Sequence, residues 1–253
     1  MKINRMMETD RTSHFKRLYE KNIDNLRFFM FGTHLQASKT LYRTAALDFP
    51  MKYHMQLTGI GKSSIDATQL FIKEETNTIL AQRIFRIVNI DSSTRAAAPI
   101  PEEIRINLQE KLSKTPDYLR LPRFDVPTSI PERRFVHEVV VRHADLDFFF
   151  HANQGSYLLY AFECATRAAA EGFYSRIHED ICYYPAKSAS AIHVAEAFAG
   201  DVLQIVTWED ISNPMSVSFA IRCKDKDIYY AKVEFYDEQD FNGNGAWSEK
   251  ESK

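Results

Sequence analysis

The feature that most constrains the fold is a long, proline-free segment at residues 154–174. It is rich in Ala and Leu, which favours a helix, and it is apolar on almost every side. The polar exceptions, Glu163, Arg167 and Glu171, lie four residues apart and would form one stripe on a helix, where Glu163 can pair with Arg167. We therefore predict a helix that is buried on most sides and exposes a single polar edge.

Strand-like segments flank this helix. Residues 135–141 precede it, and residues 191–198, 202–208, 215–223 and 228–236 follow it. The last two segments place apolar residues at every second position, as strands with one buried face do. These residues are Met215, Val217, Phe219, Ile221 and Cys223, then Tyr229, Ala231, Val233 and Phe235. The order predicts an α+β unit in which an antiparallel sheet wraps around the helix.

The first half of the chain has the same order of elements. A short strand-like start leads to a predicted helix at residues 15–30, followed by strand candidates at 34–43, 51–60, 63–72 and 79–91. The loop before the second helix also has an echo in the first half. Each residue of that echo is separated from its match by 137 positions (142 − 5 for the first pair): Arg5, Glu8, Asp10 and His14 match Arg142, Asp145, Asp147 and His151. We interpret the two halves as copies of one unit.

These patterns divide the chain into four parts. Residues 1–95 form the first unit, and residues 134–237 form the second. Residues 96–133 contain an amphipathic helix and a proline-punctuated stretch, LPRFDVPTSIPERR, which is typical of a linker laid over the surface. Residues 238–253 are polar and rich in Gly and Asn, so we expect a frayed, flexible tail.

Composition excludes several functional classes. The formal net charge of −2 does not favour a nucleic-acid or anionic-membrane binder. No stretch approaches the roughly 20 apolar residues of a membrane span, and the charged N-terminus is unlike a secretory signal. The three cysteines have no CxxC spacing, and His34, His54 and His193 have no ligand spacing, so we predict no metal site and no cofactor. The expected location is the cytoplasm.

The loop that joins residues 135–141 to the long helix carries the chemistry. The first helix amides, near residues 153–155, lack intrahelical partners and carry the positive end of the helix dipole. A carbonyl placed there would be polarised, as in an oxyanion hole. Asp147 lies just upstream, where it could attack the same carbon or serve as the base for a water. The adjacent Phe148, Phe149 and Phe150 would exclude water and strengthen these electrostatic effects.

The loop resembles the signature of hotdog-fold thioesterases of the 4-hydroxybenzoyl-CoA and acyl-ACP thioesterase type. That signature reads acid-x-Asp, three residues, His-x-Asn-Asn, then Tyr, and this chain supplies Asp145, Asp147, His151, Asn153 and Tyr157. Phe150 replaces the usual Gly and Gln154 the second Asn. In the first half, LTGIGKSSIDATQLFI and VNIDSSTRAAAPIPEEIR resemble strands and a closing segment of the same superfamily. The resemblance covers both halves and implies a double hotdog.

The resemblance also implies roles. Asp147 would be the catalytic carboxylate, the Gln154 N–H would bind the thioester carbonyl, and His151 and Asn153 would orient the acid, the water or the substrate. Phe148, Phe149, Phe150 and Tyr157 would contact the acyl group, although the Phe triplet fits a core or a unit interface equally well. Asp10 and His14 would mark a second, degenerate site, followed by Lys16 and Arg17. The implied substrates are acyl-CoA or acyl-carrier-protein thioesters, and two such chains could pair as a homodimer.

Other interpretations remain open at the sequence level. A hotdog dehydratase or hydratase acting on acyl thioesters would pair a His with an acid across the interface between units. A non-catalytic acyl-CoA-binding protein would need the fold but not the carboxylate. Asp145 and Asp147 could also cap the helix or bind Arg142, as acidic residues before helices often do.

Overall fold

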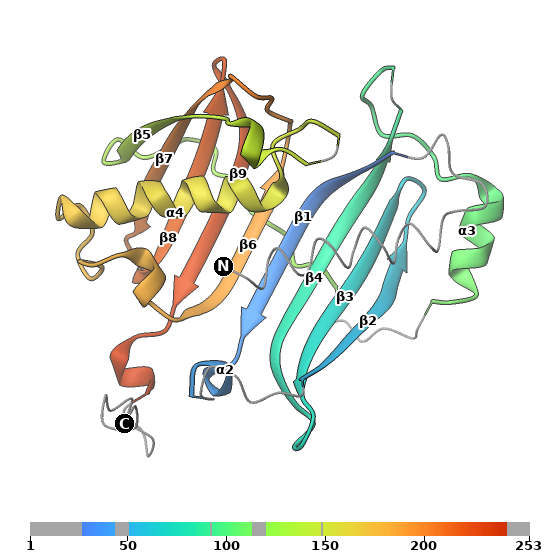
Figure 1. Ribbon diagram of the computed structural model, residues 1–253, viewed down its shortest axis with the longest axis horizontal. Coiled ribbons are helices and arrows are strands. Elements are labelled where there is room, and N and C mark those ends of the chain that lie inside the picture. Colours follow the sequence, from blue (N-terminus) through green and yellow to red (C-terminus); the bar gives the residue numbers. More distant parts are fainter. Residues whose placement is uncertain (1–26, 44–50, 92, 113–119, 148, 242–253) are drawn as a thin grey trace.

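The computed structural model describes residues 27–43, 51–91, 93–112, 120–147 and 149–241. The first half contributes the strands β1 (Arg27–Ala37), β2 (Met51–Ile60), β3 (Ser64–Lys73) and β4 (Thr78–Ile90). The second half contributes β5 (Phe135–Val140), β6 (Ala186–His193), β7 (Val202–Asp210), β8 (Asn213–Cys223) and β9 (Lys226–Phe235). Together these strands form one antiparallel sheet in the order β2-β3-β4-β1-β6-β9-β8-β7-β5 (Figure 1).

The strand order is symmetric about the pair β1–β6. Reading outward from this pair, the first half runs β1-β4-β3-β2 and the second half runs β6-β9-β8-β7, with β5 added outside β7. Each strand of the first half thus has a counterpart with the same place in the chain order of the second half. This symmetry agrees with the predicted internal repeat at the level of topology. The echoed residues Arg5, Glu8, Asp10 and His14 lie outside the described residues.

The helix α4 (Gln154–Ala170) packs against β5, β7 and β8 in the second half (Figure 1). Its buried face is mostly small, and this lets the helix lie close to the sheet; that face includes Ala161, Cys164, Ala165, Ala168 and Ala169. Glu163 and Arg167 are exposed and form the predicted ion pair, with Nη2 and Oε1 2.7 Å apart.

The helix α4 ends four residues before the predicted boundary. Gly172 has φ +69°, in the left-handed region that favours glycine. The Gly172 N–H donates to the Ala169 carbonyl, and the Phe173 N–H donates to the Ala168 carbonyl, each at 2.9 Å. This pair of bonds is a Schellman motif, which satisfies the last carbonyls and stops the helix.

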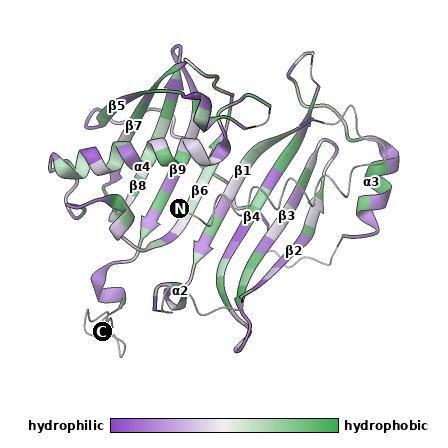
Figure 2. Ribbon diagram, in the orientation of Figure 1, coloured by the Kyte–Doolittle hydropathy of each residue, from purple (hydrophilic) through white to green (hydrophobic). Residues whose placement is uncertain are grey.

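The alternating residues of the last two long strands form the core beneath α4. In β8, the side chains of Val217, Phe219 and Ile221 are fully buried. In β9, at most 3% of each alternating residue is exposed; these residues are Tyr229, Ala231, Val233 and Phe235. The prediction of one buried face on each strand is therefore confirmed. Hydrophilic and hydrophobic residues also alternate along many of the other strands (Figure 2). No helix in the described part of the chain is long and apolar enough to cross a membrane.

The helix α3 (Glu102–Gln109) belongs to the core of the first half. Ile104 and Leu108 of α3 pack with Ile100 against buried side chains of the sheet, among them Ile65 and Phe85. The predicted boundary at residue 95 therefore cuts through this core, because α3 covers apolar sheet residues that would otherwise be exposed. Farther along the linker, Leu121 lies against β1, where a Cβ at Gly32 would be only 3.3 Å from the Leu121 side chain.

Three predicted elements differ from the structure. The helix expected at 15–30 is wrong for residues 27–30, which begin β1; its remainder lies outside the described residues. The aromatic run Phe28–Phe29 suits a central strand, and β1 pairs with both β4 and β6. The strand expected at 34–43 ends at Ala37, and α2 (Lys39–Arg43) follows it. The strand expected at 191–198 is instead β6, and residues 194–198 form a loop.

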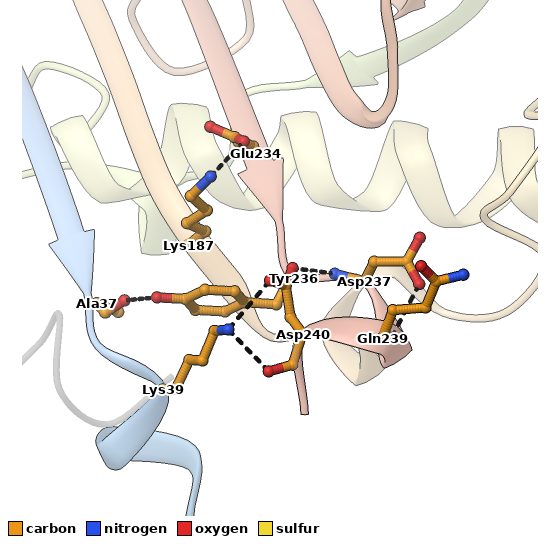
Figure 3. A network of polar contacts seen from close by, with 8 residues as sticks. All are labelled: Ala37, Lys39, Lys187, Glu234, Tyr236, Asp237, Gln239 and Asp240. Carbon is orange, nitrogen blue, oxygen red and sulfur yellow. Dashed lines mark hydrogen bonds and ion pairs between the residues drawn. The ribbon is translucent and has the colours of Figure 1, made fainter. Parts of the chain in front are cut away.

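The expectation of a frayed tail is wrong for residues 238–241. A turn of 3₁₀ helix, η4 (Glu238–Asp240), follows β9 and is capped by Asp237. Lys39 of α2 donates to the Asp240 carboxylate and carbonyl at 3.0 and 2.7 Å, and the Tyr236 hydroxyl donates to the Ala37 carbonyl at 2.8 Å (Figure 3). These bonds tie the end of β9 to the end of β1.

Phe241 completes this attachment, because its ring meets Tyr236 edge-on and lies under the Arg43 guanidinium. Only 5% of Phe241 is exposed. We predict that Phe241→Ala lowers the free energy of unfolding by about 3 kcal/mol, the usual scale for truncating a buried Phe. Urea denaturation would measure the change. The control Tyr183→Ala removes a ring that is 73% exposed and should cost less than about 0.5 kcal/mol. Equal stability of Phe241→Ala and wild type would mean that the segment is frayed after all.

Candidate active site

The loop between β5 and α4 is built around the buried Asp145. Its carboxylate accepts hydrogen bonds from the Arg142 backbone N–H and from Nε and Nη2 of the Arg142 guanidinium, at 2.9 to 3.0 Å. Burial by itself would raise the pKa of Asp145, but these bonds to Arg142 hold that pKa below its usual value. Asp145 is therefore a charged anchor of the loop, in agreement with the alternative that an acid here binds Arg142.

The backbone carbonyl of Asp145 joins the loop to the start of α4. It accepts from the Asn153 N–H at 2.8 Å and from the Ser156 hydroxyl at 2.9 Å. An isolated bridge between Leu146 and Ala152 closes the loop, so Asp147 and residues 149–151 lie in a tight turn at its tip. The tip is consequently fixed relative to the helix N-terminus.

Asp147 organises this turn. Its backbone N–H donates to the His151 carbonyl at 2.8 Å, and its Oδ1 accepts from the N–H groups of Phe149 and His151 at 2.8 and 3.3 Å. These contacts form an Asx turn. Among the described residues, no hydrogen bond reaches the second carboxylate oxygen, Oδ2. Asp147 is half-buried, and one of its two carboxylate oxygens shapes the turn.

Phe150 occupies the strained position of the turn. Its φ is +63°, in the left-handed region, and this is the position where the resembled signature has Gly. Phe150 is 75% exposed and Phe149 is 45% exposed, while Phe148 lies outside the described residues. Within the described chain, these two rings do not enclose Asp147, so the water exclusion expected of the Phe triplet is not provided by Phe149 and Phe150.

His151 faces a carboxylate that the sequence analysis did not select. Its Nδ1 lies 3.2 Å from Oε1 of Glu196, and its ring meets Phe198 edge-on at 5.1 Å between centroids. Burial lowers the pKa of His151, and the cations Arg95 and Arg27 lower it further against the opposing effect of Asp147. A neutral imidazole beside a carboxylate donates from the facing nitrogen, so we assign the proton to Nδ1 and leave Nε2 as an acceptor.

Asn153 starts α4. It adopts φ −60° and ψ 142°, and its side-chain oxygen accepts from the Gly155 N–H at 2.7 Å, as an N-cap residue does. Gln154 is the first helical residue, and its side-chain oxygen accepts from Nη2 of Arg83 at 3.3 Å. Arg83 comes from β4 of the first half and is 9% exposed. The start of the helix is therefore held in part by the other half of the chain.

Tyr157 holds the neighbouring loop in place. Its ring is buried and stacks on Tyr229, and its hydroxyl accepts from the Ala197 N–H at 2.9 Å. The Ala152 N–H donates to the Ala197 carbonyl at 2.8 Å. Both backbone groups of Ala197 are therefore hydrogen-bonded, and this fixes the position of its neighbour Glu196 beside His151. In this structure the Tyr157 side chain lies in the core cluster beneath the site.

The structure brings together four of the sequence-selected residues, Asp147, His151, Asn153 and Gln154, at one end of α4. Asp10 and His14 of the second candidate site lie outside the described residues, as do Lys16 and Arg17. Sequence reasoning missed Glu196, Arg83 and Arg95. Glu196 was assigned to a strand, although the Ala- and Gly-rich run AEAFAG that contains it is equally typical of a loop. Among the described residues, no group of three or more His, Cys, Asp or Glu side chains is arranged to hold a metal ion.

Comparison with known proteins shows the fold. No protein-family model and no curated protein sequence matches the chain. Among solved structures, the chain is similar to the 12:0-ACP thioesterase from Umbellularia californica, with a TM-score of 0.70 and 16% identity over 92% of this chain and 88% of that one. An acyl-ACP thioesterase from Bacteroides thetaiotaomicron matches with a TM-score of 0.61 and 14% identity, over 85% and 79% of the two chains.

A protein from Lactobacillus plantarum described as an oleoyl thioesterase matches with a TM-score of 0.62 and 12% identity, over 83% of this chain and 76% of that one. The chain therefore has the fold of these thioesterases along most of its length, and the resemblance noted in the sequence holds at the level of fold.

The left-handed backbone of Phe150 predicts a stability effect. Phe150→Gly should raise the free energy of unfolding by about 1 kcal/mol, because glycine adopts positive φ without the Cβ clash. The control is Tyr183→Gly, which removes a similarly exposed ring from the 3₁₀ turn Ile181–Tyr183, where φ is not positive and glycine should cost about 1 kcal/mol. Urea denaturation of the two variants would reveal opposite signs; the same sign for both would contradict the strained turn.

Proposed function

We propose that the chain is an acyl thioester hydrolase that acts on acyl-CoA or acyl-carrier-protein thioesters. The reaction adds water across the thioester bond and releases a carboxylic acid and a thiol. The observation that carries the proposal is the meeting of the Asp147 carboxylate and the His151–Glu196 pair at the N-terminus of α4. The thioesterases that share the fold support the same reaction class.

The helix N-terminus supplies the electrophilic part of the proposed site. The thioester carbonyl would accept a hydrogen bond from the Gln154 N–H at the positive end of the α4 dipole. Donors fixed before the reaction stabilise the developing oxyanion without having to reorganise. Asn153 and the Arg83–Gln154 contact hold this end of the helix in place.

Asp147 supplies the nucleophilic part. One carboxylate oxygen is held by the turn, so the other has a defined direction from which it attacks the carbonyl carbon or removes a proton from water. A single turnover in H₂¹⁸O tests for the first route: ¹⁸O in the Asp147 carboxylate shows that a mixed anhydride formed and that water opened it at the Asp147 carbonyl, so that a protein oxygen left with the product acid. His151 is fixed by Glu196 at Nδ1, and its Nε2 accepts a hydrogen bond from the attacking water or the substrate.

We further propose that the two halves are hotdog units, the first formed by residues 1–95 together with α3 and the second by residues 134–237, that form a double hotdog with the working site in the second half. The mirrored strand order and the position of α4 on the second half of the sheet support this arrangement. Arg83 links the units at the site itself, since it extends from β4 to the first residue of α4.

The activity is tested with purified protein, a panel of acyl-CoA and acyl-carrier-protein thioesters, and a thiol-trapping dye. We predict that Asp147→Asn lowers kcat/KM at least about a hundredfold, the usual scale for losing a catalytic base or nucleophile. Glu163→Gln is the control, because it makes the same acid-to-amide change at a residue that pairs with Arg167 on the exposed stripe of α4. A wild type that releases no thiol from any substrate would leave a non-catalytic acyl-binding protein; full activity in Asp147→Asn would overturn the assigned site.

The proposed role of the Gln154 backbone has its own test. Gln154→Pro removes the N–H and is compatible with the structure, because proline is favoured at the first helical position and Asn153 already has the extended conformation that precedes proline. Gln154→Ala removes only the side chain and serves as the control. We predict that kcat of the Pro variant falls about 100- to 1,000-fold below that of the Ala variant, as for loss of one oxyanion donor. Equal rates would exclude this N–H from the reaction.

A further inference from the structure

We propose that Arg95, supplied by the first half of the chain, is a positioning residue for the second-half site and holds the Glu196 carboxylate against His151. This inference rests on the proposed function and adds to it a contribution from the other half of the chain. Glu196 lies between two partners: its Oε2 forms an ion pair with Nη2 of Arg95, and its Oε1 faces Nδ1 of His151. Each carboxylate oxygen therefore has its own partner.

The surroundings of Glu196 favour a lasting contact. Its side chain is only 16% exposed, whereas that of Arg95 is 44% exposed. A carboxylate with so little access to water needs neighbouring donors or cations in place of the lost hydration. Removing one partner of such a buried ion pair therefore costs more free energy than removing a partner of an exposed pair. Arg95 and His151 together supply this compensation, one at each carboxylate oxygen.

The loop that carries Arg95 is constrained by its own hydrogen bonds. The Asp91 carboxylate accepts from the N–H and hydroxyl groups of both Ser93 and Thr94, and these bonds lower the pKa of Asp91 to about 2. The Arg95 N–H donates to the Asp91 carbonyl at 2.9 Å, and Nδ2 of Asn89 donates to the Ala98 carbonyl at 3.2 Å. The guanidinium thus extends from a fixed base.

Arg95 has φ +58°, a conformation that costs a non-glycine residue free energy. Glycine or asparagine would relieve that cost. An arginine at such a position is explained if its side chain does something that glycine cannot do, and its contact with Glu196 in the other half is the visible candidate.

The contact has a consequence for His151. The charged groups that act on this ring are Asp147 in its own turn, Arg95 from the loop after β4, Arg27 at the start of β1, and Glu196 after β6. Asp147 favours the imidazolium, whereas Arg95 and Arg27 oppose it. Loss of the Arg95 cation should therefore raise the pKa of His151. The neutral ring is the form with an acceptor at Nε2. As the pH is lowered, activity of a variant without this cation would therefore start to fall at a higher pH than activity of the wild type.

The experiment compares wild type, Arg95→Gln and Arg95→Lys. In Arg95→Gln we expect the NMR titration midpoint of His151, assigned with a His151→Gln variant, to rise by about 0.5 to 1 unit, less than a direct ion pair gives. The acid limb of kcat/KM should move by the same amount, and kcat at pH 8 should fall about tenfold as Glu196 loses its orientation. Arg95→Lys keeps the charge and should return the titration midpoint close to the wild-type value.

Arg176→Gln is the matched control. Arg176 also forms an ion pair with an acid, Asp237, at 2.9 Å, but on the surface at the start of η4. It should change neither the His151 titration nor kcat. In a Glu196→Gln background, Arg95→Gln should lose most of its effect on kcat, because the two side chains act through one contact.

Two outcomes would overturn the proposal. One is an unchanged His151 titration together with an unchanged kcat in Arg95→Gln. The other is a higher KM with an unchanged acid limb, which would make Arg95 a contact for a phosphate of the substrate's carrier. The titration does not require turnover, so it decides the Arg95 contact even if the wild type hydrolyses no thioester and the proposed function fails.

Discussion

The pairing of β1 with β6 is the interaction on which the rest of the structure depends. It runs in antiparallel register from Gly32 opposite Ile192 to Gln36 opposite Ser188, and His34 and Ser190 add a side-chain contact of 2.7 Å. Each strand would otherwise end its half of the sheet with unpaired N–H and C=O groups. Joining them makes one sheet and brings β4 and its following loop to the site. Arg83 and Arg95 reach the second half only because this pairing holds.

The candidate site shows how the requirements of a helix start and of chemistry are met by the same loop. Asp145 and Asn153 are used by the structure itself: one anchors Arg142 and the backbone, and the other caps α4. One oxygen of Asp147 holds the turn, and in the proposed function the other acts on the thioester or on water. The mixture of acids, amides and a histidine in this stretch therefore has a structural reason as well as a chemical one, and the variants above separate the two at Asp147 and Gln154.

Much of the fold could be predicted where the signal is local. The small, apolar face of α4 and the alternation in β8 and β9 are properties of consecutive residues, and both were predicted correctly. The predictions were wrong where contacts with distant parts of the chain determine the secondary structure. Phe28 and Phe29 fit a helix as well as a strand until β4 pairs with them. Residues 194–198 fit a strand until Ala197 is held by Ala152 and Tyr157. In both places contacts distant in the chain override weak local preferences.

The sequence by itself determined the long buried helix, the alternating strands, the repeated order of four strands, and the loop that carries Asp147, His151 and the start of α4. These follow from periodicity, from helix-capping chemistry and from the spacing of neighbouring residues. Only the tertiary structure decided which groups meet that loop. Glu196 comes to His151, Arg95 comes to Glu196, and Arg83 comes to Gln154 across 71 positions of the chain. No local pattern encodes such contacts, and the two that Arg95 and Arg83 make depend on the register in which β1 pairs with β6.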